Sequence, residues 1–212
     1  MQTDIRLTED GSHTLYVPEI DECYHSTHGA IQESMHIFIR AGLLRFLSAA
    51  GFSTESDAER FIEPVVEYSG KVQPLRVAGG YLKSSVNILE IGFGTGLNAY
   101  LTLLEAEKRR IPIYYTSLEL YPLPVEVALR LNYPETLQEY HDNAARTATE
   151  ASDVFTEILS EGADSVFRKK RRLFEQLHRS PWEEDCGITP CFTLHKIKTD
   201  FIIVCKSITI II

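Results

Sequence analysis

The segment Asn87–Asn98, with the sequence N-I-L-E-I-G-F-G-T-G-L-N, constrains the fold of this chain more than any other part. A short apolar run, Val86–Ile91, predicts a buried strand and leads straight into three alternating glycines. Glycine lets the backbone turn sharply and come close to a ligand, because no Cβ is in the way. The pattern that follows, Leu97–Arg109, predicts a helix. A strand, a glycine loop and a helix in this order predict an α/β domain.

The downstream chain continues the same alternation. Ile113–Leu118 predicts a second strand, Leu123–Leu131 a helix, and Cys191–Ile197 a third strand. Residues 135–179 are polar and mostly helical in pattern, with a basic run at 168–172. The fold class expected is therefore α/β, with a mostly parallel, Rossmann-like sheet covered by helices.

The N-terminal part predicts a hairpin and a helix. Asp10-Gly11 lies between the β-prone runs Ile5–Thr8 and Thr14–Val17, which is typical of a hairpin turn. From Ala30 to Gly51 apolar residues recur at helical spacing, at positions 31, 35, 38, 39, 43, 46 and 47. Residues 53–66 predict a further short helix, and 67–85 a loop or linker.

Acidic residues beside the glycine loop indicate the ligand. Glu90 precedes the first glycine by two positions, and Glu119 ends the second strand, where it can accept hydrogen bonds from ribose hydroxyls. The N–H groups at the start of the helix suit a carboxylate. Together these features favour S-adenosylmethionine (SAM). A dinucleotide is the competing ligand, but Leu97 stands where its third glycine belongs. A purely structural turn is the other alternative.

Composition adds few constraints. The net charge of −9 argues weakly against broad nucleic-acid binding. The four cysteines form no C-x-x-C pair, and His25, His28 and His36 have no carboxylate or thiol pattern around them, so no metal site is expected. The sequence shows no secretory signal and no run that would span a bilayer. We therefore expect a cytoplasmic enzyme without a membrane partner.

Three segments together resemble one family. They are Y-H-S-T-H-G-A-I-Q-E-S-M-H-I-F-I at 24–39, residues 88–98, and S-L-E-L-Y-P-L at 117–123, with weaker matches at 177–182 and 192–196. The chain resembles the methyltransferase domain of the MnmC-type bacterial enzymes that make 5-methylaminomethyl-2-thiouridine at the tRNA wobble position. The resemblance runs from about residue 20 to about residue 200, with an apparent insertion at 51–85.

The resemblance implies a cofactor, a reaction and a set of site residues. SAM would be held by Glu90, Gly92, Gly94, Gly96, Asn98 and Glu119, with Asp200 facing the adenine, while Tyr24, Ser26, Gly29 and Glu33 would line the cofactor or substrate entrance. The implied reaction transfers a methyl group to the primary amine of 5-aminomethyl-2-thiouridine in tRNA. A separate oxidoreductase is the implied source of that substrate, since this chain has no room for the family's FAD domain.

The family's catalytic segment, which resembles D-A-F-x-P-x-x-x-P-x-x-W, does not occur in this sequence, so the catalytic group is unknown. The chain instead continues into an isoleucine-rich stretch, 201–212. We therefore expect a methyltransferase fold that is incomplete at its C-terminus, as after a frameshift. The expected division is an N-terminal extension at 1–85, a partial SAM-binding domain at 86–200 and an aberrant tail at 201–212. Methylation of a small molecule, and a non-catalytic remnant, stay open as alternatives.

Overall fold

The computed structural model describes residues 2–50, 52, 76–77, 80–81, 85–137 and 155–200, and the side chains of most of them. The predicted helix at 53–66 and the tail at 201–212 lie outside these residues. The chain divides into two compact units. The hairpin unit comprises Met1–Ser34 and Leu123–Arg179, and the sheet unit comprises Met35–Pro122 and Ser180–Ile212. Each unit is described by itself.

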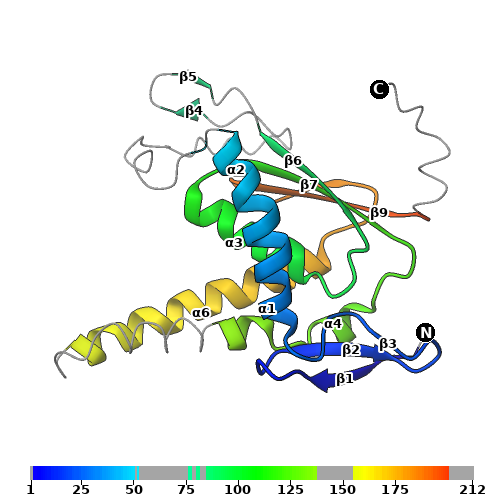
Figure 1. The fold of residues 1–212 in the computed structure, drawn as a ribbon. Coiled ribbons are helices and arrows are strands. Elements are labelled where there is room, and N and C mark those ends of the chain that lie inside the picture. Colours follow the sequence, from blue (N-terminus) through cyan, green and yellow to red (C-terminus); the bar gives the residue numbers. More distant parts are fainter. Residues whose placement is uncertain are drawn as a thin grey trace. The chain divides into compact units, whose positions relative to one another are not determined.

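The hairpin unit begins with the predicted hairpin (Figure 1). Strands β1 (Asp4–Leu7) and β2 (His13–Val17) pair antiparallel, and β2 also pairs with the two-residue β3 (Glu22–Cys23). The turn between β1 and β2 contains Gly11, whose φ of 82° explains the choice of glycine. The prediction of a hairpin around Asp10-Gly11 is confirmed.

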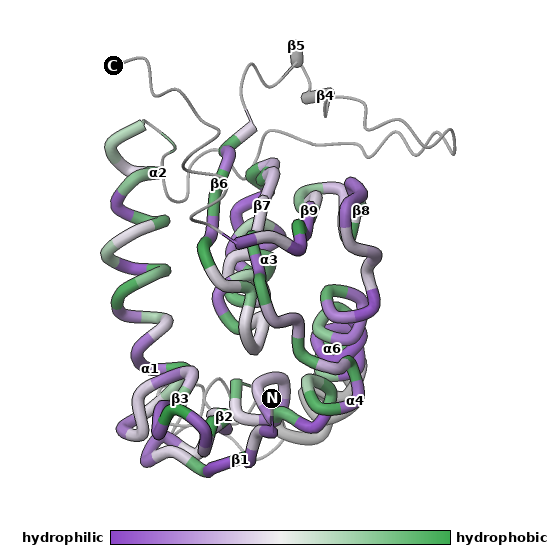
Figure 2. Tube along the Cα trace, turned by 90° about the vertical axis from the view of Figure 1, so that its right-hand side faces the viewer, coloured by the Kyte–Doolittle hydropathy of each residue, from purple (hydrophilic) through white to green (hydrophobic). Residues whose placement is uncertain are grey.

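Among the described residues, the hairpin unit also contains the helices α1 (Ala30–Ser34), α4 (Val125–Ala128) and α6 (Phe155–Arg179), and a helical segment at 133–137. Helix α4 is shorter than the predicted 123–131, because Pro124 forms its N-cap and the chain turns after Leu129. Figure 2 shows hydrophilic and hydrophobic residues alternating along α6, as in an amphipathic helix. The buried apolar residues of this unit are Leu15, Val17, Ala30, Ile31, Ala128, Leu131, Tyr133, Leu137, Leu173, Phe174 and Leu177.

The sheet unit is built on a four-stranded sheet in the order β6-β7-β9-β8 (Figure 1). Strands β6 (Val86–Ile91), β7 (Ile113–Glu119) and β9 (Phe192–Lys198) are parallel, as predicted. Strand β8 (Asp185–Thr189) was not predicted and pairs antiparallel with β9. Its sequence, D-C-G-I-T, has no regular apolar alternation, so only the pairing with β9 makes it a strand.

Helix α3 (Leu97–Arg109) joins β6 to β7 and packs on β7 and β9. Alternate residues of each parallel strand point to the α3 side and are buried, including Val86, Ile113, Tyr115, Phe192 and Leu194. Arg110 closes α3 in the left-handed conformation, with φ of 54°. The prediction of this helix is confirmed at both ends.

The long N-terminal helix differs from its prediction. After α1 it continues as a π-helix, η1 (Met35–Leu44), and then as α2 (Arg45–Ala49). Ile39 and Leu43, which the sequence placed on the apolar stripe, are buried. Phe46, which the α-helical pattern placed on the apolar face, is 56% exposed.

The region predicted as a loop also contains a small hairpin, β4 (Arg76–Val77) with β5 (Gly80–Tyr81).

Asp10 joins the hairpin turn to α1. Its carboxylate accepts hydrogen bonds from the Thr8 hydroxyl, from both the backbone and the hydroxyl of Ser12, and from the backbone N–H of Gln32 in α1. A Cβ added at Gly29 would lie 2.6 Å from Asp10 Oδ2. Glycine at position 29 has no Cβ and therefore leaves space for the Asp10 carboxylate.

We expect Gly29→Ala to lower the free energy of unfolding by about 2 kcal/mol, because the methyl group would displace an acceptor of several hydrogen bonds. Urea unfolding followed by circular dichroism measures the change. Gly42→Ala in η1 is the control, since its Cβ would make an ordinary contact of 3.5 Å with the Ile37 carbonyl. Equal stability of the two variants would contradict the role assigned to Gly29.

Candidate functional site

The glycine loop connects β6 to α3 and has a backbone that only glycine adopts readily. Gly92, Gly94 and Gly96 have φ values of 87°, 52° and 70°. The Gly92 N–H donates to the Leu118 carbonyl at 2.7 Å, which extends the pairing of β6 with β7 into the loop. A Cβ on Gly92 would meet open space, so its φ rather than crowding requires glycine there. The loop is thus fixed at one end and open to a ligand.

Glu119, at the end of β7, holds this loop in place. One carboxylate oxygen accepts the Gly94 N–H at 2.9 Å, and the other accepts the Tyr121 N–H at 2.8 Å. The acid that was predicted to bind ribose therefore lies beside the glycine loop, at the carboxyl edge of the sheet. Ligands of open α/β sheets bind at this edge.

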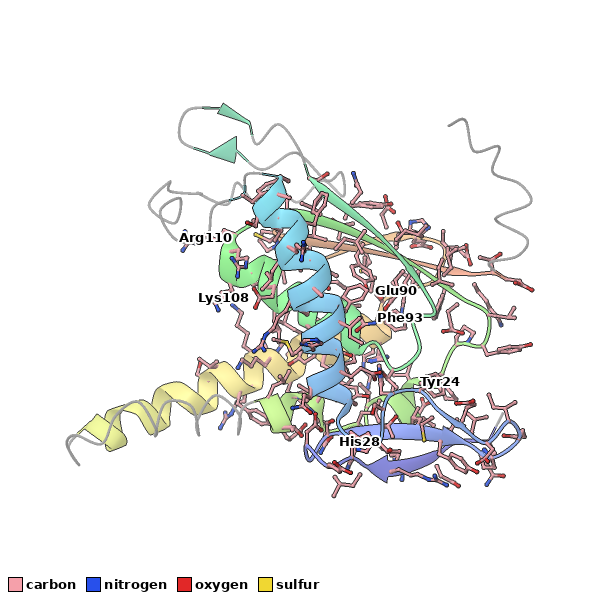
Figure 3. All side chains as sticks on the ribbon, viewed as in Figure 1. Tyr24, His28, Glu90, Phe93, Lys108 and Arg110 are labelled. Carbon is pink, nitrogen blue, oxygen red and sulfur yellow. The ribbon has the colours of Figure 1, made fainter. Side chains whose placement is uncertain are left out.

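Glu90 is buried at the end of β6, with 6% of its surface exposed, and Figure 3 shows it close to Phe93. Burial raises the pKa of the Glu90 carboxyl to about 7, and the hydrogen bond from Ser117 only partly opposes this rise. The Ser117 hydroxyl donates to Glu90 Oε2 at 2.7 Å. Glu90 is therefore a buried acid that titrates near neutral pH.

The first turn of α3 adds donors and an acceptor. Gly96 forms its N-cap, and no side chain caps the helix, so the N–H groups of the first turn face the loop side. Asn98 also lies in this turn, and its buried Oδ1 has no hydrogen-bond partner among the described residues. The N–H groups of this turn fit a ligand that carries a carboxylate.

Asp200 follows β9 at the same edge. The Thr199 N–H donates to the Glu119 carbonyl at 3.0 Å, which continues the pairing of β9 with β7 as far as the residue before Asp200. The sheet unit therefore brings together Glu90, the three glycines, Asn98, Glu119 and Asp200, from three parallel strands and one helix.

Tyr24, Ser26 and Glu33 belong to the hairpin unit. The Ser26 N–H donates to Glu33 Oε2 at 2.9 Å, and His25 Nδ1 lies 3.8 Å from the same oxygen. The Tyr24 N–H donates to the Leu15 carbonyl. These contacts give Glu33 a structural part in ordering residues 25–26. The predicted position of the three residues at a cofactor entrance stays a prediction.

Lys196 was not anticipated as a residue of interest. It lies on β9 with 1% of its surface exposed, and its Nζ is 5.2 Å from the centre of the Phe93 ring and 4.8 Å from that of Trp182. Burial lowers the pKa of Lys196 to about 8. The sequence indicates that this side chain is buried, because position 196 continues the alternation of Phe192 and Leu194 and so lies on the same face of the strand.

Across the described ranges, no three His, Cys, Asp or Glu side chains gather as metal ligands would. None of the helices in that part of the chain is long and apolar enough to span a bilayer. His28 contacts Glu9 at 3.0 Å on an exposed surface, and His25 is buried, which lowers its pKa.

Comparisons with known proteins agree with the fold. No family model matches the sequence, and no curated protein matches it either. Among solved structures, the crystal structure of MNMC2 from Aquifex aeolicus is similar, with a TM-score of 0.53 and 19% sequence identity. The alignment covers 99% of this chain and 46% of that chain, so this chain spans about half its length. The likeness shows that the chain has the mixed α/β, methyltransferase-like fold predicted from the sequence.

Proposed function

We propose that this chain is a SAM-binding methyltransferase domain of the cytoplasm. The observation that carries the proposal is the arrangement of Glu119 and the glycine loop, in which the Glu119 carboxylate already engages the Gly94 N–H at the carboxyl edge of the sheet. A ribose beside this loop would meet an acceptor of the required charge. The N–H groups of the first turn of α3 support a ligand that has a carboxylate at this position.

The residues present fit SAM as follows. Glu119 would accept hydrogen bonds from the ribose hydroxyls, the first turn of α3 would bind the methionine carboxylate, and Asp200 would face the adenine. Glycines 92, 94 and 96 would let the cofactor approach the backbone. When bound, SAM supplies an electrophilic methyl group for transfer to a nucleophile.

The proposed substrate is the primary amine of 5-aminomethyl-2-thiouridine at the wobble position of tRNA, supplied by a separate oxidoreductase. Residues 24–39 support this proposal, because they resemble the family that acts on it. Helix α6 adds exposed basic side chains, those of Lys169, Arg172 and Arg179. Such arginine and lysine side chains bind phosphates electrostatically.

Not every member of the basic run is available for RNA. The Arg171 guanidinium bonds instead to the Glu135 carboxylate and to the Leu129 carbonyl, within the hairpin unit. Arg171 therefore connects α6 to the segment after α4 by hydrogen bonds. The phosphate-binding role is proposed only for the exposed residues named above.

Calorimetric titration with SAM tests the cofactor, and a methyl-transfer assay on tRNA that lacks only the final methyl group tests the reaction. We expect a micromolar Kd for SAM, comparable binding of S-adenosylhomocysteine, and transfer of labelled methyl to the tRNA. Failure to bind SAM would refute the proposal at its first step. Transfer to a free aminomethyl nucleoside, but not to tRNA, would identify a small-molecule methyltransferase instead.

A SAM-binding module without transfer activity is the second candidate. Transfer to an amine requires a group that takes the amine's proton, and no described residue is assigned that role. Such an amine is mostly protonated near neutral pH, so its nucleophilic lone pair depends on that help. Tight SAM binding with no transfer to any acceptor would select this candidate.

A further inference from the structure

Three buried side chains lie in one row across the parallel sheet. Glu90 on β6 is in register with Ser117 on β7, and Ser117 is in register with Lys196 on β9. Residues in register on parallel strands point to the same face, and all three are buried. Glu90, which lies two residues before the glycine loop, and Lys196 therefore lie on the same face of the sheet, the face that α3 covers.

The backbone around Lys196 is firmly held. Its strand is paired on both sides, with β7 and with β8. Trp182 forms a parallel bridge with Lys196, and the Glu183 N–H donates to the Lys196 carbonyl at 2.7 Å. Lys196 and Trp182 thus form a fixed frame whose backbone positions do not depend on the glycine loop.

Phe93 belongs to the loop itself, between Gly92 and Gly94. Its ring is 6% exposed and lies edge-on to Trp182, with the two ring centres 6.1 Å apart. The Lys196 ammonium group lies within about 6 Å of both ring centres, which is the range in which a cation is attracted to an aromatic ring. This attraction is greatest when the groups are away from water, as Lys196 and Phe93 are.

We propose that Lys196 is a positioning residue for the glycine loop. Its ammonium group attracts the Phe93 ring toward the fixed frame and so holds the neighbouring glycines in the conformation that receives the cofactor. Glycine-rich backbone is otherwise the most flexible kind, and a loop that must be ordered by its ligand binds that ligand more weakly. The inference rests on the proposed SAM binding.

Burial of the charged Lys196 ammonium group destabilises the fold. A positioning role and a structural role of Lys196 therefore predict different effects when the charge is removed. Burying an ammonium group disfavours its charged form, as the lowered pKa of Lys196 reflects. Methionine has a similar length and no charge. We therefore expect Lys196→Met to leave the thermal unfolding midpoint unchanged or higher, while the affinity for SAM falls.

The experiment measures the Kd for SAM by calorimetry in four proteins: wild type, Lys196→Met, Phe93→Leu and the double variant. We expect each single substitution to raise the Kd about 3- to 30-fold, the range of a desolvated cation–π contact. The double variant should be no weaker than the weaker single variant, because both substitutions remove the same contact. Lys198→Met, at an exposed position of the same strand, is the matched control.

Trp182 provides an independent readout, since it is the single tryptophan of the chain. We expect SAM to change its fluorescence in the wild type, through Phe93, and to change it much less in Lys196→Met and Phe93→Leu. Independent, additive effects of the two substitutions, or wild-type affinity in Lys196→Met, would overturn the inference. If Lys196→Met does not fold, Phe93→Leu decides by the same two readouts. A wild type that does not bind SAM refutes the proposed function and this inference with it.

Discussion

Replacing Glu119 by glutamine is expected to weaken SAM binding about 100-fold, because each charge-assisted hydrogen bond lost contributes about 1.5–3 kcal/mol. In the free protein both oxygens of this carboxylate accept backbone N–H groups, from Gly94 and from Tyr121. Glutamine keeps one oxygen and replaces the other by an NH₂ donor, which would face a backbone donor. The substitution therefore disturbs the glycine loop as well as removing an acceptor for ribose.

Calorimetry with SAM measures this loss, with Glu126→Gln on the exposed surface of α4 as the control. The control removes the same charge from the protein at an exposed position of the other unit, so its Kd should equal that of the wild type. A Kd for Glu119→Gln within about threefold of the wild type would show that this carboxylate does not bind the cofactor.

Replacing Glu90 by glutamine is expected to stabilise the free protein at pH 8. The fold raises the pKa of Glu90 from 4.5 to about 7, so ionisation of this carboxyl above neutral pH is unfavourable in the folded state. At 1.36 kcal/mol for each pKa unit, the penalty is about 3 kcal/mol. Glutamine has nearly the same shape, keeps an oxygen for the Ser117 hydroxyl and removes the charge.

The pH dependence gives the sign of the effect. Below pH 4.5 Glu90 is protonated in both folded and unfolded chains and costs nothing. As the pH rises from 4.5 to about 7, the unfolded chain releases this proton first, so the stability of the wild type falls; above that range the loss is complete. Glu90→Gln should lack this decline.

Thermal unfolding at pH 4.5 and at pH 8 measures the difference. We expect a Tm for Glu90→Gln up to about 10 °C above the wild type at pH 8, and a much smaller difference at pH 4.5. Glu126→Gln is again the control. If the variant gained no stability at pH 8, the burial of an ionising Glu90 carboxyl would be disproved. A parallel loss of SAM affinity would indicate that Glu90 is kept for binding rather than for stability.

Much of the sheet unit is predictable from local patterns. The strand at 86–91, the helix at 97–109 and the strand beginning at Ile113 each have a regular apolar period, and the structure confirms all three. The positions of the glycines likewise predict a loop with unusual φ angles, which Gly92, Gly94 and Gly96 adopt. In these segments the residue's own conformational preference and its burial favour the same structure.

Elements that depend on partners were not predictable. Strand β8 exists because β9 offers it a paired edge, and the apolar spacing does not show that Met35–Leu44 forms a π-helix. Phe46 is exposed although the sequence placed it on the apolar face. Pairing partners and helical type are decided by packing, which a single-sequence pattern does not contain.

The sequence by itself determined the three parallel strands, the helix that follows the glycine loop, the loop itself and the acids that flank it, because these depend on residues adjacent in the chain. Only the tertiary structure decided that Glu119 bonds to Gly94 and that Lys196 lies against Phe93. The register of β6, β7 and β9 brings these residues together across distances of 25 residues and more along the chain. Burial in that arrangement changes the pKa of Glu90 and of Lys196, since desolvation acts on a group only where the folded chain encloses it.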